Sequence, residues 1–204
     1  QHLRKLTKES KKNKSWNHWN NYGKKEGRSL SKTTSIVFKG SWGCLYSHIK
    51  TLELAIKNKL KNVLILEDDF MPHVRLNELT KKLENIMKNN NWKVIYLGTS
   101  QYKWDKISIQ NNFYYANESF GTFAYIINNN FFNEFLNEYK KFDDGADQIL
   151  KKLQVKYPQD FLVIYPNLII SNLDLKSNTN TCLSNDLYHS FKWNKYYYNY
   201  FEFK

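Results

Sequence analysis

The sequence predicts an α/β domain with a mainly parallel central sheet, and two observations carry this prediction. The first is the uninterrupted apolar run NVLIL at residues 62–66, which leads directly into the acidic triplet EDD at residues 67–69. Such a run is typical of a central strand that is buried on both faces. The second is the alternation of helical and strand patterns around it, which indicates β–α–β units. At 204 residues, the chain is expected to form a single domain, 1–204.

The elements before the acidic strand are a basic segment, a short strand and a long helix. Residues 1–35 are polar and rich in lysine, so we expect a loop with a short helix. Residues 36–38 read IVF and are interpreted as a strand. A helix is expected to begin near Gly43, because apolar residues recur from there at helical spacing. They are Leu45, Ile49, Leu52, Ile56 and Leu60.

The elements after the acidic strand follow the same alternation. The expected helices cover residues 76–86, 131–139 and 144–153, and the expected strands cover 94–98, 113–116, 120–127 and 161–165. The strands at 113–116 and 120–127 are interpreted as a pair around a turn at 117–119. Residues 171–186 are rich in Ser, Asn and Thr, which predicts a flexible loop, and 187–204 form an aromatic and basic tail.

Composition narrows the class of protein. No apolar run reaches the length that a membrane-spanning helix needs, and the first residues, QHLRK, do not form a signal peptide. The two cysteines, Cys44 and Cys182, do not make a disulfide framework, so free thiols in a reducing compartment such as the cytoplasm are favoured. The net charge of +12 is spread along the chain, and nucleic acid is not an expected partner.

The acidic triplet is the strongest chemical signal. Three adjacent carboxylates at a strand end repel one another unless a cation is present, and oxygen ligands suit Mn²⁺ or Mg²⁺. Side chains two apart on an extended chain point the same way, so Glu67 and Asp69 could share one ion. The alternative is that these acids only cap the next helix.

Four segments together resemble glycosyltransferase family 25, which includes lipopolysaccharide and collagen galactosyltransferases. Residues 40–48, GSWGCLYSH, are similar to the family's G-x-x-G-C-x-x-S-H segment. They are followed at a matching distance by VLILEDD at 63–69. WKVIYLG at 92–98 and FGTFAYII at 120–127 resemble two later segments, and the resemblance runs from about Gly40 to Thr181.

This resemblance implies a Rossmann-like nucleotide-diphosphosugar transferase of the GT-A type. The expected reaction moves galactose or glucose from a UDP-sugar donor to a hydroxyl acceptor on a glycan or protein, with Mn²⁺ or Mg²⁺ at the diphosphate. Asp69 is the expected direct metal ligand, with Glu67 or Asp68 as the second. The other residues expected at the donor site are Ser47, His48, Glu67, Asp68, Gly121 and Thr122.

Asp147 is the expected general base of an inverting transfer, where a carboxylate takes the proton of the attacking hydroxyl. The alternative is that DGAD at residues 144–147 only caps a helix. His48 has the alternative role of a hydrogen-bonded core histidine, and Cys44 is interpreted as a small buried hydrophobe. The loop at 171–186 could act as a lid, and Asp174 or His189 could add a third metal ligand.

One departure from the family pattern keeps alternative functions open. Residues 1–39 contain no strand of the type I-N-L-D-R with which family members usually open. The alternative function is therefore a catalytically impaired glycan- or nucleic-acid-binding domain, and a metal-dependent nuclease is a third class. The tail is expected to pack on the domain or on a second subunit in a homo-oligomer, with a membrane surface as a further possible partner.

Overall fold

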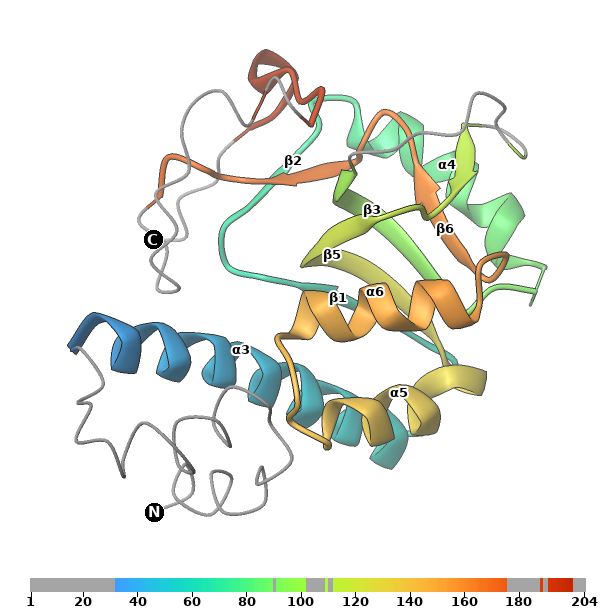
Figure 1. Cartoon of the computed structure of the whole chain (residues 1–204). Coiled ribbons are helices and arrows are strands. Elements are labelled where there is room, and N and C mark those ends of the chain that lie inside the picture. Colours follow the sequence, from blue (N-terminus) through green and yellow to red (C-terminus); the bar gives the residue numbers. More distant parts are fainter. Residues whose placement is uncertain are drawn as a thin grey trace, which may run out of the picture.

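The computed structural model describes residues 32–89, 91–101, 109, 112–175, 188 and 191–199, with side chains from Gly40 onward. These residues form a twisted five-stranded sheet with helices on both faces (Figure 1). Helices α3 (Lys32–Lys57), α5 (Phe132–Tyr139) and α6 (Ala146–Lys156) lie on one face. Helix α4 (Leu76–Met87) lies on the other face.

The strands largely fall where the apolar runs predict them. The main sheet contains β1 (Asn62–Leu66), β3 (Val94–Gln101), β4 (Phe113–Tyr115), β5 (Ser119–Asn128) and β6 (Phe161–Ile164). A separate antiparallel ribbon, which the sequence did not predict, joins β2 (Phe70–Pro72) to β7 (Ile169–Ser171). Two short 3₁₀ turns are η2 (Asn129–Phe131) and η3 (Lys195–Tyr197).

The prediction of a mainly parallel sheet is wrong for the described strands. Their order is β1-β5-β3-β6-β4, and only β3 and β6 pair in parallel. Strands β1 and β3 do run in the same direction, because each pairs antiparallel with β5. The alternation of helices and strands therefore correctly predicts that β1 and β3 run parallel to each other. It does not predict that β5 lies between them. The α/β class is confirmed, and the Rossmann-like GT-A assignment stays a prediction.

The expected pairing of the strands at 113–116 and 120–127 is also wrong. Strand β4 pairs with β6, while β5 pairs with β1 and β3. The link at 116–118 is as short as a hairpin turn, but the two strands occupy distant positions in the sheet. Strand β5 has ten residues, most of them buried, so its apolar length favours an interior position between two partners.

Strand β1 lies at the edge of the described sheet rather than at its centre. Its described partner is β5 alone, in antiparallel register from Asn62 opposite Asn128 to Leu66 opposite Ala124. Leu64 and Leu66 are 48% and 39% exposed, while Ile65 is buried. An apolar run alone does not distinguish a strand buried on both faces from one buried on a single face.

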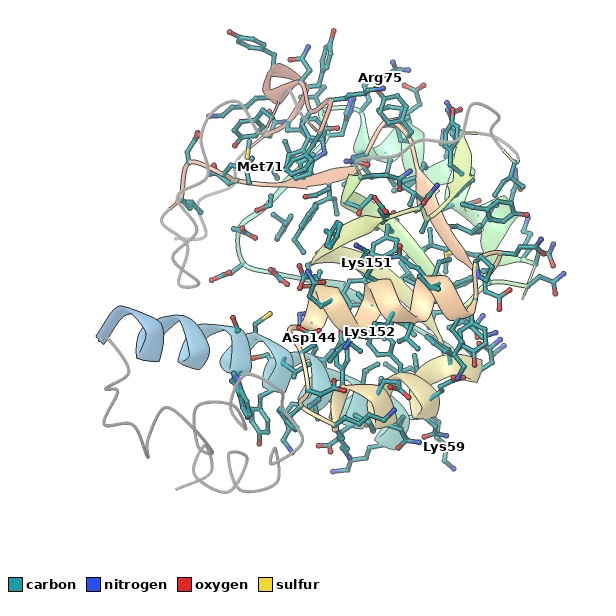
Figure 2. All side chains as sticks on the ribbon, in the orientation of Figure 1. Lys59, Met71, Arg75, Asp144, Lys151 and Lys152 are labelled. Carbon is teal, nitrogen blue, oxygen red and sulfur yellow. The ribbon has the colours of Figure 1, made fainter. Side chains whose placement is uncertain are left out.

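Alternating residues of the sheet divide between two hydrophobic cores. On β3, Val94 and Tyr96 face α3, α5 and α6, and Ile95 and Leu97 face the side of α4. This is the period of two that a strand with both faces covered requires. Figure 2 shows Met71 of β2 on the α4 side, away from Lys59 in the turn that follows α3.

Helix α3 is longer than expected. It begins at Lys32, so the strand predicted at 36–38 is wrong: these residues are helical. A run of three residues with strand preference is too short to override a helix that continues through it. The predicted apolar face is confirmed where Leu45, Ile49 and Leu52 are buried, whereas Leu60 lies beyond the helix end and is exposed.

The described part of the tail packs onto the domain, as expected. Tyr188, Phe191, Trp193 and Tyr198 are buried in the core on the α4 side, and Tyr198 forms a β-bridge with His73. Tyr196 is 94% exposed. Among the described helices, none combines the length and the apolar character needed to cross a membrane.

Candidate functional site

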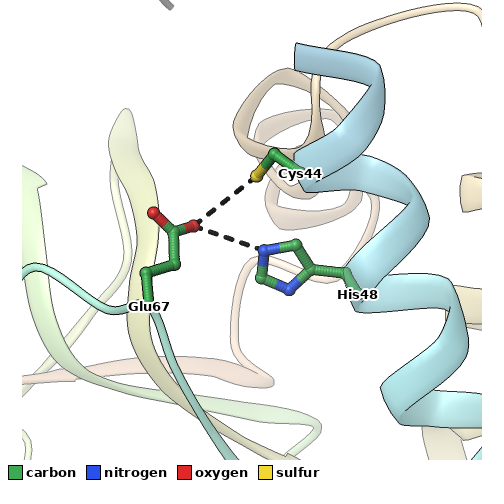
Figure 3. A group of neighbouring side chains, drawn as sticks. All are labelled: Cys44, His48 and Glu67. Atoms are coloured by element: carbon green, nitrogen blue, oxygen red, sulfur yellow. Dashed lines mark hydrogen bonds and ion pairs between the residues drawn. The ribbon is translucent and has the colours of Figure 1, made fainter. Parts of the chain in front are cut away.

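Glu67 follows β1 directly, and its carboxylate turns toward helix α3. The backbone N–H of Glu67 donates to Phe123 O at 2.9 Å, which extends the β1–β5 ladder by one residue. Its Oε1 faces His48 Nε2 at 3.3 Å and the Cys44 thiol at 3.8 Å (Figure 3). The same oxygen accepts a short hydrogen bond from the Thr122 hydroxyl. One carboxylate oxygen thus joins α3 to two neighbouring strands.

His48 links this carboxylate to a buried tyrosine. Its side chain is only 4% exposed, and its Nδ1 lies 2.8 Å from the Tyr125 hydroxyl. An ionised carboxylate can only accept, so Nε2 carries the proton that is donated to Glu67. In the neutral imidazole, Nδ1 then accepts the proton of the Tyr125 hydroxyl.

The electrostatics of this group follow from burial and hydrogen bonding. Burial raises the pKa of Glu67, but the hydrogen bonds from His48 and Thr122 outweigh burial and hold the pKa below its usual range. Burial, with the negative charge of Glu67 beside it, raises the pKa of the Cys44 thiol to about 12. At neutral pH the group therefore contains a carboxylate and a protonated thiol.

Asp69 lies two residues further on, in a different environment. Its Oδ2 accepts a hydrogen bond from the Ser171 hydroxyl on β7, and its backbone oxygen accepts one from Asn172 N at 2.8 Å. Its Oδ1 is buried and has no hydrogen-bond partner among the described residues. Burial raises the pKa of Asp69, and the charges of Glu67 and Asp68 raise it further.

A glycine allows the ribbon that holds Ser171 to approach the sheet. A Cβ at Gly98 of β3 would lie 1.8 Å from the backbone oxygen of Ile169, the first residue of β7. No side chain fits at that distance, so this approach requires glycine. Leu168 N also donates to Leu97 O at 2.7 Å, which fixes the start of β7 beside β3.

Asp147 is the second residue of α6, and it is half-buried. Its Oδ1 accepts a hydrogen bond from Gln148 N at 2.8 Å. The N-cap of α6 is Gly145, which has no side-chain cap, while Asp144 accepts from Gly145 N and pairs with Lys152 at 3.0 Å (Figure 2). Burial raises the pKa of Asp147, and the charges of Asp144 and Glu67 add to this rise.

The comparison with protein families decides the class of protein. Residues 6–150 match the family described as glycosyltransferase family 25 (LPS biosynthesis protein). The chain belongs to this family. No curated protein matches the chain at a significant level. A family 25 protein is a glycosyltransferase, so family membership supports enzymatic glycosyl transfer as the function.

The family match extends the resemblance in one direction and shortens it in the other. It begins at residue 6, before the segment at 40–48, and ends at residue 150, before Thr181. Residues 6–39, whose sequence lacks an I-N-L-D-R motif, therefore lie within the region that matches family 25.

The structure brings together some of the expected residues of the family 25 site and not others. Glu67, His48 and Thr122 are in contact. Ser47 is exposed on α3 and donates to Gly43 O of its own helix at 2.9 Å. Asp68 is exposed in the turn that follows β1, and Gly121 has a positive φ of 91°.

Neither Asp174 nor His189, the residues suggested as a third metal ligand, is described in contact with Asp69. Asp174 forms an ion pair with Lys195, and His189 lies outside the described residues. Most of the loop predicted at 171–186 also lies outside them, but its first residue, Ser171, belongs to β7 and contacts Asp69.

Three residues of the site were not found by sequence reasoning in their actual roles. Cys44 was interpreted as a buried hydrophobe, whereas its thiol faces Glu67. Its spacing of four from His48 could have placed both side chains on one face of a helix. Tyr125 and Ser171 had no such signal, because their contacts depend on which strands become neighbours.

Proposed function

We propose that this protein is a metal-dependent, inverting glycosyltransferase that moves galactose or glucose from a UDP-sugar to a hydroxyl acceptor on a glycan or protein. One observation supports it above the others: Asp69 has a buried carboxylate oxygen without a described partner, at the end of the acidic strand of a family 25 chain. A buried charged oxygen is costly unless it is paired or coordinates a cation.

The donor set around Asp69 fits a hard divalent cation. Asp69 Oδ1 is buried without a described partner, the charges of Glu67 and Asp68 act on its carboxylate, and oxygen ligands are those that Mn²⁺ and Mg²⁺ prefer. Asp69 would be the direct ligand. Asp68 is the better second ligand than Glu67, because Oε1 of Glu67 already accepts from three donors on α3 and β5. When bound, the cation would stabilise the negative charge of the leaving nucleoside diphosphate.

Asp147 would take the proton of the acceptor hydroxyl. Burial raises its pKa, which makes the carboxylate a better proton acceptor than an exposed aspartate. Its hydrogen bond to Gln148 N at 2.8 Å fixes Oδ1 at the start of α6 and leaves Oδ2 for the acceptor. An inverting transfer needs no covalent sugar intermediate, so one base of this kind suffices.

The remaining site residues would serve the donor. Gly121 has a backbone conformation that glycine favours, and the Phe123 ring lies where its Cβ would be, so any contact with the sugar would be made by its backbone N–H or C=O. His48 and Thr122 would hold the end of β1 in place through Glu67. Ser47, exposed on the same face of α3 as Gly43, would lie toward the ribose or phosphate.

The test is calorimetric titration of UDP, UDP-galactose and UDP-glucose with and without Mn²⁺. We expect the protein to bind UDP and one of the UDP-sugars only with Mn²⁺. Asp69→Asn should abolish this binding, and Asp68→Asn should weaken it without abolishing it. Asp160→Asn is the matched control. Asp160 directly precedes β6 and pairs with Lys93 at 2.6 Å, and neither residue belongs to the proposed donor site. Absence of binding in the unmodified protein, with and without Mn²⁺, would instead favour the catalytically impaired binding domain.

The role of Asp147 needs a separate measurement. Asp147→Asn should leave the affinity for UDP-sugar and Mn²⁺ within about twofold and reduce transfer to an acceptor, or to water, by about 100-fold or more. Asp143→Asn is the control on the preceding turn. NMR of the released sugar should show the anomer opposite to that of the donor, and retention of configuration would exclude the inverting mechanism.

A further inference from the structure

We propose that Cys44, His48 and Glu67 form a binding site for Zn²⁺, distinct from the Mn²⁺ site at Asp69. Within the described part of the chain, these three residues place one ligating atom each within 4.8 Å of one another. Two of them come from consecutive turns of α3, and the third follows β1 (Figure 3). The proposal does not depend on the proposed transferase function.

The spacing of the ligating atoms suits a tetrahedral ion. Zn²⁺ binds sulfur, imidazole nitrogen and carboxylate oxygen at bond lengths that place tetrahedral ligands about 3.3–3.6 Å apart. Glu67 Oε1 lies 3.3 Å from His48 Nε2 and 3.8 Å from Cys44 Sγ. All three atoms lie within 4.8 Å of one another, so side-chain adjustments of about 1 Å or less would seat an ion among them.

The surrounding residues supply the outer shell that metal ligands need. Metal-bound histidines usually donate the proton of the other ring nitrogen to a fixed partner. His48 Nδ1 lies 2.8 Å from the buried Tyr125 hydroxyl, and Thr122 donates to the Glu67 carboxylate. On binding, the Cys44 proton would leave to solvent, and His48 would carry its remaining proton on Nδ1 rather than Nε2.

The ligand types separate this site from the one at Asp69. Thiolate and imidazole favour Zn²⁺ and Co²⁺ over Mn²⁺ and Mg²⁺, which prefer oxygen. Three protein ligands leave a fourth position for water, as in zinc sites with an open position. A bound ion would also connect α3 to the β1–β5 edge of the sheet, so Zn²⁺ should raise the melting temperature.

The experiment uses Co²⁺ as a spectroscopic probe and Zn²⁺ as the competitor. We expect one equivalent of Co²⁺ to give a thiolate-to-cobalt charge-transfer band and a tetrahedral visible spectrum, both removed by one equivalent of Zn²⁺. Cys44→Ser should abolish the charge-transfer band, and His48→Gln should weaken Zn²⁺ binding by about 100-fold or more. Circular dichroism establishes that each variant is folded.

Three control variants test whether the cobalt and zinc signals come from the Cys44–His48–Glu67 site. Cys182→Ala should leave the cobalt spectrum unchanged, since Cys182 is the only other thiol of the chain. Tyr125→Phe should weaken Zn²⁺ binding by about tenfold while keeping the charge-transfer band, the behaviour of an outer-shell partner. Asp69→Asn should bind Zn²⁺ normally, whether or not it binds UDP with Mn²⁺. The proposal is overturned by a band that persists in Cys44→Ser, by one lost in Cys182→Ala, or by no Zn²⁺ binding in the unmodified protein.

Discussion

Glu67 and Asp69 lie two residues apart at one strand end, yet their carboxylates differ in almost every property. Oε1 of Glu67 accepts from three side chains, and its pKa is lowered. Asp69 accepts from Ser171 through one oxygen, its other oxygen is buried without a described partner, and its pKa is raised. The first carboxylate is stabilised by the fold, and the second is destabilised by it.

The two carboxylates differ because Glu67 faces helix α3 and Asp69 faces strand β7. The α3 side offers donors, namely a thiol, an imidazole and a hydroxyl, that converge on one oxygen. The β7 side offers one hydroxyl and a closely packed backbone. An acidic triplet is therefore not a uniform metal-binding motif. One member can stabilise the fold while another is left with an unsatisfied charge, and only the second requires a ligand.

The largest effect is expected where the β7 side is held in place. Gly98→Ala would set a Cβ 1.8 Å from Ile169 O, so β7 and Ser171 must move away from Asp69. We expect a loss of about 3 kcal/mol in the free energy of unfolding, measured by urea denaturation. Gly43→Ala is the matched control, because nothing lies within 4 Å of a Cβ there. It should stabilise α3 by about 0.5–1 kcal/mol, and equal losses in the two variants would contradict this account.

The next effect concerns the α3 side. Glu67→Ala removes the shared acceptor and leaves the His48 and Thr122 donors without a partner. Each unsatisfied buried donor costs about 1–3 kcal/mol, so we expect a total loss of about 2–3 kcal/mol after partial exposure to solvent. Glu67→Gln keeps an accepting oxygen and should lose less. A loss as large in Glu67→Gln would show that charge, rather than hydrogen bonding, dominates.

The pH dependence of the Glu67 contribution has a defined sign. Because the pKa of Glu67 is lower in the folded state, its stabilising effect is present above the unfolded pKa and is lost as pH falls through the folded value. The difference in stability between the unmodified protein and Glu67→Gln should therefore be constant from about pH 6 to 7 and shrink below about pH 4. A difference that grows on acidification would contradict the lowered pKa.

A smaller effect is expected at the far end of the same network. Tyr125→Phe removes the hydroxyl that lies 2.8 Å from His48 Nδ1 and leaves the ring packing intact. We expect a loss of about 1 kcal/mol in the free energy of unfolding. Tyr157→Phe, which removes a partly exposed hydroxyl from Glu134, serves as the control and should cost less. If the two losses are equal, His48 Nδ1 has found another partner.

The amino-acid sequence predicts the two carboxylate sites unevenly, and the reason is physical. Apolar periodicity is a local property, so it places β1, the Leu45–Leu52 face of α3 and most other elements correctly. Strand neighbours are non-local. The insertion of β5 between β1 and β3 brings Thr122 and Tyr125 to Glu67 and His48, and no local pattern encodes it.

The same limit applies to the β7 side of the site. EDD at residues 67–69 predicts that charge gathers there, but Ser171 reaches Asp69 only because the β2–β7 ribbon forms, and its strands of 3 residues each are too short to show a strand period. Gly98 was noted only as the end of a strand motif. Its requirement for glycine becomes visible once the oxygen of Ile169 is placed against it.

The smallest expected effect has the opposite sign to the others. Because the pKa of Asp69 is raised in the folded state, its ionised carboxylate destabilises the fold at neutral pH, and this penalty is absent below the unfolded pKa. Asp69→Asn should therefore raise the free energy of unfolding of the metal-free protein by about 0.5 kcal/mol at pH 7, a gain that disappears below about pH 4.

The same variant should lose what the unsatisfied oxygen is proposed to provide. With Mn²⁺ and UDP present, the unmodified protein should melt at a higher temperature than without them, and Asp69→Asn should show no shift. If Asp69→Asn is more stable than the unmodified protein without ligand and less stable with it, the Asp69 carboxylate serves binding rather than folding. If Asp69→Asn is instead destabilised at pH 7 without metal, the bond from Ser171 outweighs the buried charge, and Asp69 then resembles Glu67 in stabilising the fold.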